Sequence, residues 1–233
     1  LLLPRLGGSA AVWNTAMVFF QATLLVGYLV AHLGLRHLPM GAHRLAHLGL
    51  LAAAAAVLPI AIPSSWAPPD GDPVAWTFLV LAVVVGLPFL ALATMSPTLQ
   101  RWLAATDHPS GADPYFLSGA GNAGSFLALL AYPLVLEPAA GVAAQTRWWA
   151  TGYGVLVVLT AACALAAHVR RRPAPASTAV RARPTSRQAL RWTAVAAVPS
   201  ALLLGVTRHL ATDVASIPLL WVVPLALYLL TFV

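Results

Sequence analysis

The stretch TRHLATDVASIP, residues 207–218, has polar residues of the types and spacing that proton or cation chemistry requires. His209 and Asp213 are four residues apart, so a helix would place both on one face. Below a membrane surface, an imidazole beside a carboxylate would form a proton- or cation-responsive pair. The alternative is an exposed turn in which Arg208 pairs with Asp213 and Ser216 caps the next helix. The sequence leaves both interpretations open.

Two further pairs of candidate substrate-binding residues lie inside apolar stretches. Asn14 and Gln21 are seven residues apart, hence on one helix face, and Asn122 and Ser125 are three apart. An amide in hydrocarbon must find a hydrogen-bond partner, so we expect these side chains, and Asn122 above all, to face the protein interior. There they either bond between helices or line a substrate cavity.

Gly119, Gly121 and Gly124 spell G-x-G-x-x-G, the pattern of a dinucleotide-binding loop. Such a loop needs a buried strand before it and a second strand after its helix, and the surrounding sequence predicts neither. Ala120, Gly124 and Ala128 recur at four-residue spacing, which favours a close helix-packing surface. No cofactor is therefore predicted in this chain.

Other combinations that support catalysis or metal binding are not predicted. His43 and His47 have the i, i+4 spacing of a metal site on a helix, but no carboxylate or thiolate is near them in the sequence. Cys163 is the only cysteine and lies in an apolar run. Because the sequence contains no nucleophile–base arrangement or carboxylate pair, we predict no catalytic residue and no metal site.

The composition requires that the elements holding these residues face lipid. The chain of 233 residues is 60% hydrophobic and 8% charged, whereas soluble domains carry about 25% charged residues. The net charge of +7 comes from arginine alone. Because the arginines separate apolar runs and do not form one polar face, nucleic-acid binding is not predicted.

The apolar runs predict an all-α, polytopic transmembrane helix bundle of about seven helices. Each run is near the ~20 residues that span a bilayer, and is twice the length of a barrel strand. The runs lie at 11–35, 45–62, 75–95, 115–136, 148–169, 192–210 and 217–233.

Arginine placement predicts the orientation of the bundle. Ten arginines fall in alternate breaks between the runs, and only Arg5, Arg147 and Arg208 fall on the other side, which satisfies the positive-inside rule. The chain divides into a five-helix part (1–169), an Arg/Pro-rich cytoplasmic linker (170–191) and two further helices (192–233), the last truncated. It begins at Leu1 and stops in an apolar run, so we expect it to be part of a longer protein.

Three blocks of sequence resemble the membrane region of bacterial fused major-facilitator-like/spermidine-synthase-like proteins. They are residues 7–21, 96–138 and 207–233, and the Asn-x-Gly-Ser core of such proteins is matched by Asn122 to Ser125. Relatives often have Thr where this chain has Arg208. The resemblance implies a major-facilitator-like inner-membrane domain, with further helices and an aminopropyltransferase-type domain downstream.

Two functional expectations follow from this resemblance. The first is a transporter-like domain that handles polyamines or similar small cations, with Asn14, Gln21, Asn122, Ser125, His209 and Asp213 as candidate binding residues. The alternative is a non-transporting membrane anchor for the downstream enzyme domain. The expected partners are the lipid bilayer, a small cationic substrate and that enzyme domain.

Overall fold

The computed structural model describes residues 2–6, 10–68, 71–170, 184–209 and 222–231, and these form helices and connections without a β-strand. The all-α prediction is therefore confirmed. In chain order the elements are α1 (Leu3–Leu6), α2 (Ala10–His37), α3 (Met40–Ala55), α4 (Val74–Val84), α5 (Gly86–Ala93), α6 (Met95–Ala104), the 3-10 turn η1 (Pro109–Gly111), α7 (Phe116–Ala131), the π-helical η2 (Tyr132–Leu136), α8 (Glu137–Ala139), α9 (Val142–Val169), α10 (Ser186–His209) and α11 (Val222–Leu230).

Four helical stretches are long and apolar enough to cross a membrane. These are Ala11–His37, Phe116–Ala139, Val142–Val169 and Ser186–Thr207, and the bent stretch from Val74 to Ala104 makes five if it counts as one span. Each predicted apolar run contains helix, and the length and composition of these helices are compatible with a membrane protein. Within the described residues, α3 and α11 are shorter than a span.

Helix α3 differs from the predicted run at 45–62. It begins earlier, at Met40, directly after Pro39, because proline has the backbone angle that a helix start requires. It ends at Ala55, four residues before Pro59, and the described residues between it and α4, 56–68 and 71–73, form no helix. Proline disfavours helical geometry in the residue before it, so the apolar run cannot continue as one helix.

The predicted third run is broken into separate helices. Pro88 cannot donate a hydrogen bond to the carbonyl of Val84, and its ring crowds that carbonyl. Helix α4 accordingly ends at Val84, and the stretch that follows from Gly86 to Ala104 is inclined to it by 65°. Helix α6 occupies part of the stretch 96–114, which we expected to be a polar break, and it buries Thr98 and Trp102.

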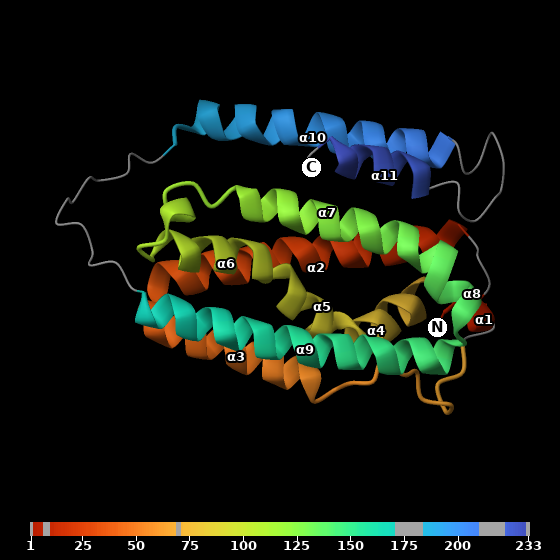
Figure 1. The fold of residues 1–233 in the computed structure, drawn as a ribbon. Helices are drawn as coiled ribbons and strands as arrows, with labels where there is room; N and C mark the ends of the chain where they lie inside the picture. Colours follow the sequence, from red (N-terminus) through yellow and green to blue (C-terminus); the bar gives the residue numbers. More distant parts are fainter. Residues whose placement is uncertain (1, 7–9, 69–70, 171–183, 210–221, 232–233) are drawn as a thin grey trace. The chain divides into compact units, whose positions relative to one another are not determined.

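The chain forms two compact units. Unit 1 contains residues 1–114 and 140–172, and unit 2 contains residues 115–139 and 173–233. In unit 1, α2 packs against α4, α5 and α6, and α3 lies beside α9 (Figure 1). In unit 2, α11 packs against α7 and α10. Helix α10 begins at Ser186, inside the predicted linker 170–191, of which residues 171–183 lie outside the described part.

The G-x-G-x-x-G residues lie within helix α7, as the helix-packing interpretation predicted. Among the described residues, the predicted close packing is not observed at two of these glycines, because a methyl group added to Gly121 or Gly124 would meet no atom within 4 Å. The close approach lies in unit 1 instead, where a methyl group on Gly27 of α2 would collide with Ala93. Small residues permit close packing, and the partner helix decides which of them is used.

Candidate functional site

The buried polar side chains of unit 1 converge between α3 and the α5–α6 segment. Helix α3 contributes His43, Arg44 and His47, which are only 5%, 6% and 5% exposed. The opposite segment contributes Thr94, Thr98 and Trp102, all buried. The four-residue spacing of His43 and His47, and of Thr94, Thr98 and Trp102, places each of these two groups on one helix face. We call His43, His47, Thr94, Met95 and Trp102 the imidazole site.

His43 is held by Trp102. The indole Nε1 donates a hydrogen bond of 3.3 Å to His43 Nδ1, and the two rings meet edge-on with centroids 6.2 Å apart. Because an indole nitrogen can only donate, His43 Nδ1 must be the unprotonated ring nitrogen. The neutral ring therefore carries its proton on Nε2, near Gly34 of α2, where an added methyl group would lie 3.3 Å from that atom.

His47 has two different partners. Its Nδ1 lies 3.3 Å from Thr94 Oγ1, and its Nε2 lies 3.4 Å from the thioether sulfur of Met95. The rings of His43 and His47 are parallel, with centroids 6.3 Å apart. The two imidazoles therefore bond in different directions. They do not converge on one point, although their i, i+4 spacing is one that suits a shared metal ion.

Arg44 joins α3 to the end of α9. Its Nη2 donates a 3.0 Å hydrogen bond to the carbonyl of Ala167. The end of α9 is also bonded to the chain after α6, because the backbone N–H of Asp107 donates to the carbonyl of Arg170. Burial, followed in size by the charge of Arg44, lowers the pKa of His43, which precedes the predicted run 45–62. The neutral form of His43 is therefore the form that the folded site favours.

The opposite end of unit 1 is organised by Arg5. Its guanidinium donates to the carbonyls of Trp66 at 2.7 Å and of Ile62 and Pro63 at 3.3 Å. These bonds fix the irregular segment after α3 against the beginning of the chain. Arg5 and Arg44 thus lie toward opposite ends of the unit, because Arg5 contacts the chain after the end of α3 and Arg44 lies near the beginning of that helix.

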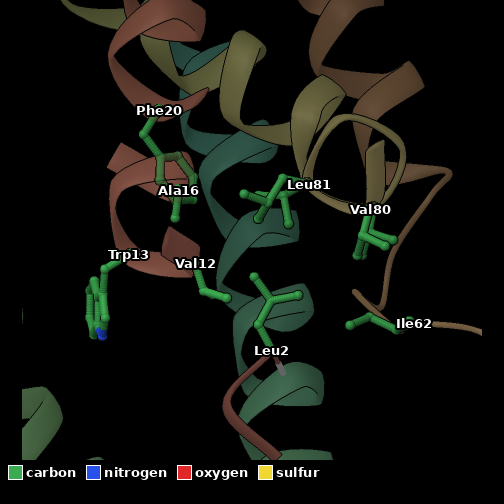
Figure 2. Close-up of a pocket in the computed structure, with 10 residues that line it drawn as sticks. Leu2, Val12, Trp13, Ala16, Phe20, Ile62, Val80 and Leu81 are labelled. Atoms are coloured by element: carbon green, nitrogen blue, oxygen red, sulfur yellow. The ribbon is translucent and has the colours of Figure 1, made fainter. Parts of the chain in front are cut away.

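A cavity of about 270 Å³ lies near the Arg5 end of unit 1. Figure 2 shows side chains of α2 and α4 around it, together with Leu2 and Ile62. Its walls are apolar: Leu2, Val12, Trp13, Ala16, Phe20, Ile62, Val80, Leu81, Val84 and Val85. Such walls can accept hydrocarbon, and they offer no side-chain oxygen to a cation.

The predicted substrate-binding residues of α2 do not point into unit 1. Asn14 and Gln21 are exposed, whereas we expected both amides in the interior. The interior face of α2 is instead formed by residues such as Val12, Phe19 and Ala31, which pack more closely than amides would. The structure therefore does not bring Asn14 and Gln21 to the cavity or to the imidazole site.

The remaining candidates belong to unit 2. Asn122 is half-buried and Ser125 exposed on α7, which has no buried residue among those described. The prediction that Asn122 is buried is thus met only in part. His209 is exposed at the end of α10. Asp213 lies outside the described residues, so the predicted pair of His209 and Asp213 is not observed.

The sequence contained a partial signal for the imidazole site. His43 and His47 are four residues apart, and the same spacing separates Thr94, at the end of the predicted run 75–95, from Thr98 and Thr98 from Trp102, both in the expected break 96–114. Met95 could not be found this way, because nothing in its neighbourhood marks it as a partner of a residue 48 positions earlier. In the described part of the chain, no three residues among His, Cys, Asp and Glu are grouped to hold a metal.

Comparison with known proteins adds no relative from which a function could be transferred. No protein-family model matches the chain, and no curated protein and no solved structure matches it either.

Proposed function

We propose that the chain is a polytopic domain of the bacterial inner membrane, with about seven major-facilitator-like helices. The observation that supports this proposal is the outward-facing apolar surface of its span-length helices. Leu25 on α2 and Val158 and Leu165 on α9 are 64–70% exposed, and large apolar side chains are similarly exposed along α10. In water this surface would be unfavourable by about 25 cal/mol for each Å² of apolar area, whereas a bilayer covers it.

The orientation proposed from the arginines is supported by the packing of unit 1. His43 lies beside Gly34 of α2 and accepts a hydrogen bond from Trp102 of α6, and the next residue, Arg44, bonds to Ala167 of α9. The arginine-bearing ends of α2, α3, α6 and α9 therefore lie together. A common end is what the positive-inside rule requires of cytoplasmic arginines. The linker 170–191 follows α9 and would then also be cytoplasmic.

Single-cysteine labelling tests this orientation. In a Cys163→Ser background, Ser64→Cys lies beside the carbonyls that Arg5 binds, and Ser110→Cys lies beyond α6. A membrane-impermeant maleimide should label Ser64→Cys in intact spheroplasts and Ser110→Cys only after permeabilisation. Equal labelling of both sites in intact spheroplasts, or release of the protein from membranes by alkaline carbonate, would contradict the proposal.

The first candidate role is transporter-like handling of polyamines or similar small cations. It rests on the resemblance of three sequence blocks to fused spermidine-synthase-like proteins and on the spacing of His209 and Asp213. A carboxylate within the bundle would attract a polycation. Uptake of labelled spermidine should fall when Asp213→Asn is introduced into the full-length protein, with exposed Asp72→Asn as the control. Unchanged uptake would remove this role.

A second candidate role, as a non-transporting anchor for a downstream enzyme domain, is favoured by the interior of unit 1. The described acidic residues, Asp72, Asp107, Asp113 and Glu137, are all exposed, and the cavity has apolar walls. The described interior therefore offers no carboxylate to a polyamine. An anchor predicts that Asn122→Leu impairs assembly but not substrate specificity, and that an unrelated membrane anchor restores the activity of the full-length protein.

A further inference from the structure

We propose that His47 Nε2 and Met95 Sδ form a binding site for a soft monovalent metal ion of the Cu(I) or Ag(I) type. The two atoms lie 3.4 Å apart, and both residues are held in the imidazole site of unit 1. The proposal does not depend on transport or on the orientation of the domain. It rests on which atoms of these two side chains and of their neighbours carry a hydrogen that can be donated.

The position of the His47 proton is fixed by Thr94. The Thr94 hydroxyl has one hydrogen, which it donates to the carbonyl of Ala91 at 2.7 Å. Thr94 Oγ1 can therefore only accept at its 3.3 Å contact with His47 Nδ1. A neutral His47 thus carries its hydrogen on Nδ1 and directs the lone pair of Nε2 at the sulfur of Met95.

The sulfur of Met95 has no hydrogen to offer, because a thioether only accepts. Its other polar neighbour is the hydroxyl of Thr160, at 4.0 Å, which also donates to the carbonyl of Leu156 at 2.8 Å. The shorter bond takes the one hydrogen of that hydroxyl. Two lone-pair donors therefore face each other in a partly buried place without a hydrogen between them.

A proton or a metal ion can join two such donors. Protonation of His47 would place a cation on a ring that is only 5% exposed. That ring is stacked on His43, and the residue after His43 is Arg44, which carries a permanent charge. A buried charge of this kind is costly without an anion, and the described acidic residues are all exposed. A monovalent metal ion brings the same total charge, but it forms a coordinate bond to each of the two neutral ligands in return.

The separation of the two atoms allows one ion to bind both, and the ligand types select the metal. With bonds of the lengths that zinc makes to nitrogen and sulfur, about 2.0 and 2.3 Å, a separation of 3.4 Å gives a bent arrangement with an angle of roughly 105° at the metal. Thioether and imidazole together favour soft ions such as Cu(I). The bond from His47 Nδ1 to Thr94 and on to Ala91 is the outer hydrogen-bond support that metal-binding histidines ordinarily have.

Silver titration of the purified full chain in nanodiscs, without a histidine tag, tests the site. Cys163 is exposed and would bind silver itself, so all proteins carry Cys163→Ser. We expect one Ag(I) per chain by calorimetry, with affinity lowered at least about 10-fold by Met95→Leu or His47→Gln. Met17→Leu and His32→Gln, exposed on α2, are the matched controls and should bind like the parent.

The protonation state of His47 in NMR spectra tests the site even if a variant misfolds. Met95→Leu conserves volume and should fold, and circular dichroism and gel filtration check this. In ¹⁵N spectra at neutral pH, His47 should be the neutral Nδ1–H form, and Ag(I) should shift its Nε2 resonance together with the Met95 methyl signal. An imidazolium, an Nε2–H tautomer, or Met95→Leu binding Ag(I) as tightly as the parent would overturn the proposal.

Discussion

The indole Nε1 of Trp102 donates a 3.3 Å hydrogen bond to Nδ1 of His43, which joins α6 to α3 inside unit 1. Trp102→Phe keeps most of the ring packing and leaves that imidazole nitrogen without its donor. We expect a loss of roughly 1–3 kcal/mol in the free energy of unfolding, the cost of an unsatisfied buried group. Denaturant unfolding in detergent measures it. Trp149→Phe, at a more exposed ring of the same unit, should change stability far less.

The contact of Gly27 with Ala93 makes a second prediction. A methyl group at Gly27 would meet the side chain of Ala93 and, at 3.2 Å, its carbonyl carbon, so α2 and α5 must separate. Gly27→Ala should destabilise the protein by about 1–3 kcal/mol. Gly49→Ala on α3 meets no atom within 4 Å and should stabilise it by about 0.5–1 kcal/mol. Equal effects at the two positions would contradict the described packing of α2.

Stability should depend on pH through His43. Because the folded protein lowers the pKa of His43, the unfolded chain binds more protons around the ordinary value. The free energy of unfolding is therefore level above about pH 6.5 and falls as the pH decreases below that value. Thermal unfolding from pH 8 to 5 should show this slope, and His43→Gln should make it shallower without removing it, because protonation of the buried His47 is costly as well. The exposed His37→Gln should leave the slope unchanged.

Arg5 should control the segment that follows α3. Its guanidinium bonds to the carbonyls of Ile62, Pro63 and Trp66, and hydrogen bonds to a charged group contribute about 1.5–3 kcal/mol. Arg5→Gln should therefore speed hydrogen exchange of the amides at 62–66 by roughly 10-fold or more. Arg147→Gln, at an exposed arginine, is the control and should leave exchange in this segment unchanged.

The sequence predicted helices better than their ends or their contacts. Apolar runs of span length located α2, α7, α9 and α10, because lipid-facing composition is a property of each run by itself. The end of α3 before Pro59 and the break before Pro88 follow from proline chemistry, which the length of a run does not reveal. The choice of Gly27 over Gly121 for close packing depends on where the partner helix lies.

The imidazole site was missed for a related reason. His43 and His47 are near each other in the sequence, which suggests a shared role. In the structure they have separate partners, Trp102 for His43 and Met95 for His47. Met95 is the last residue of the predicted run 75–95, and Trp102 lies in the stretch 96–114, whose prolines and polar residues predicted a surface break. A pattern search over short spacings cannot pair residues that only tertiary packing brings together.

The break between α4 and α5 also divides unit 1 into two mechanical parts. Val80, Leu81 and Val84, before the break, form one wall of the apolar cavity, whereas Thr94 and Met95 lie beyond it beside His47. Because Pro88 removes a backbone hydrogen bond at this joint, α4 is coupled less tightly to the segment that follows than an unbroken helix would be. A change in the width of the cavity can thus be absorbed at the joint, and the spacing of His47 and Met95 is preserved.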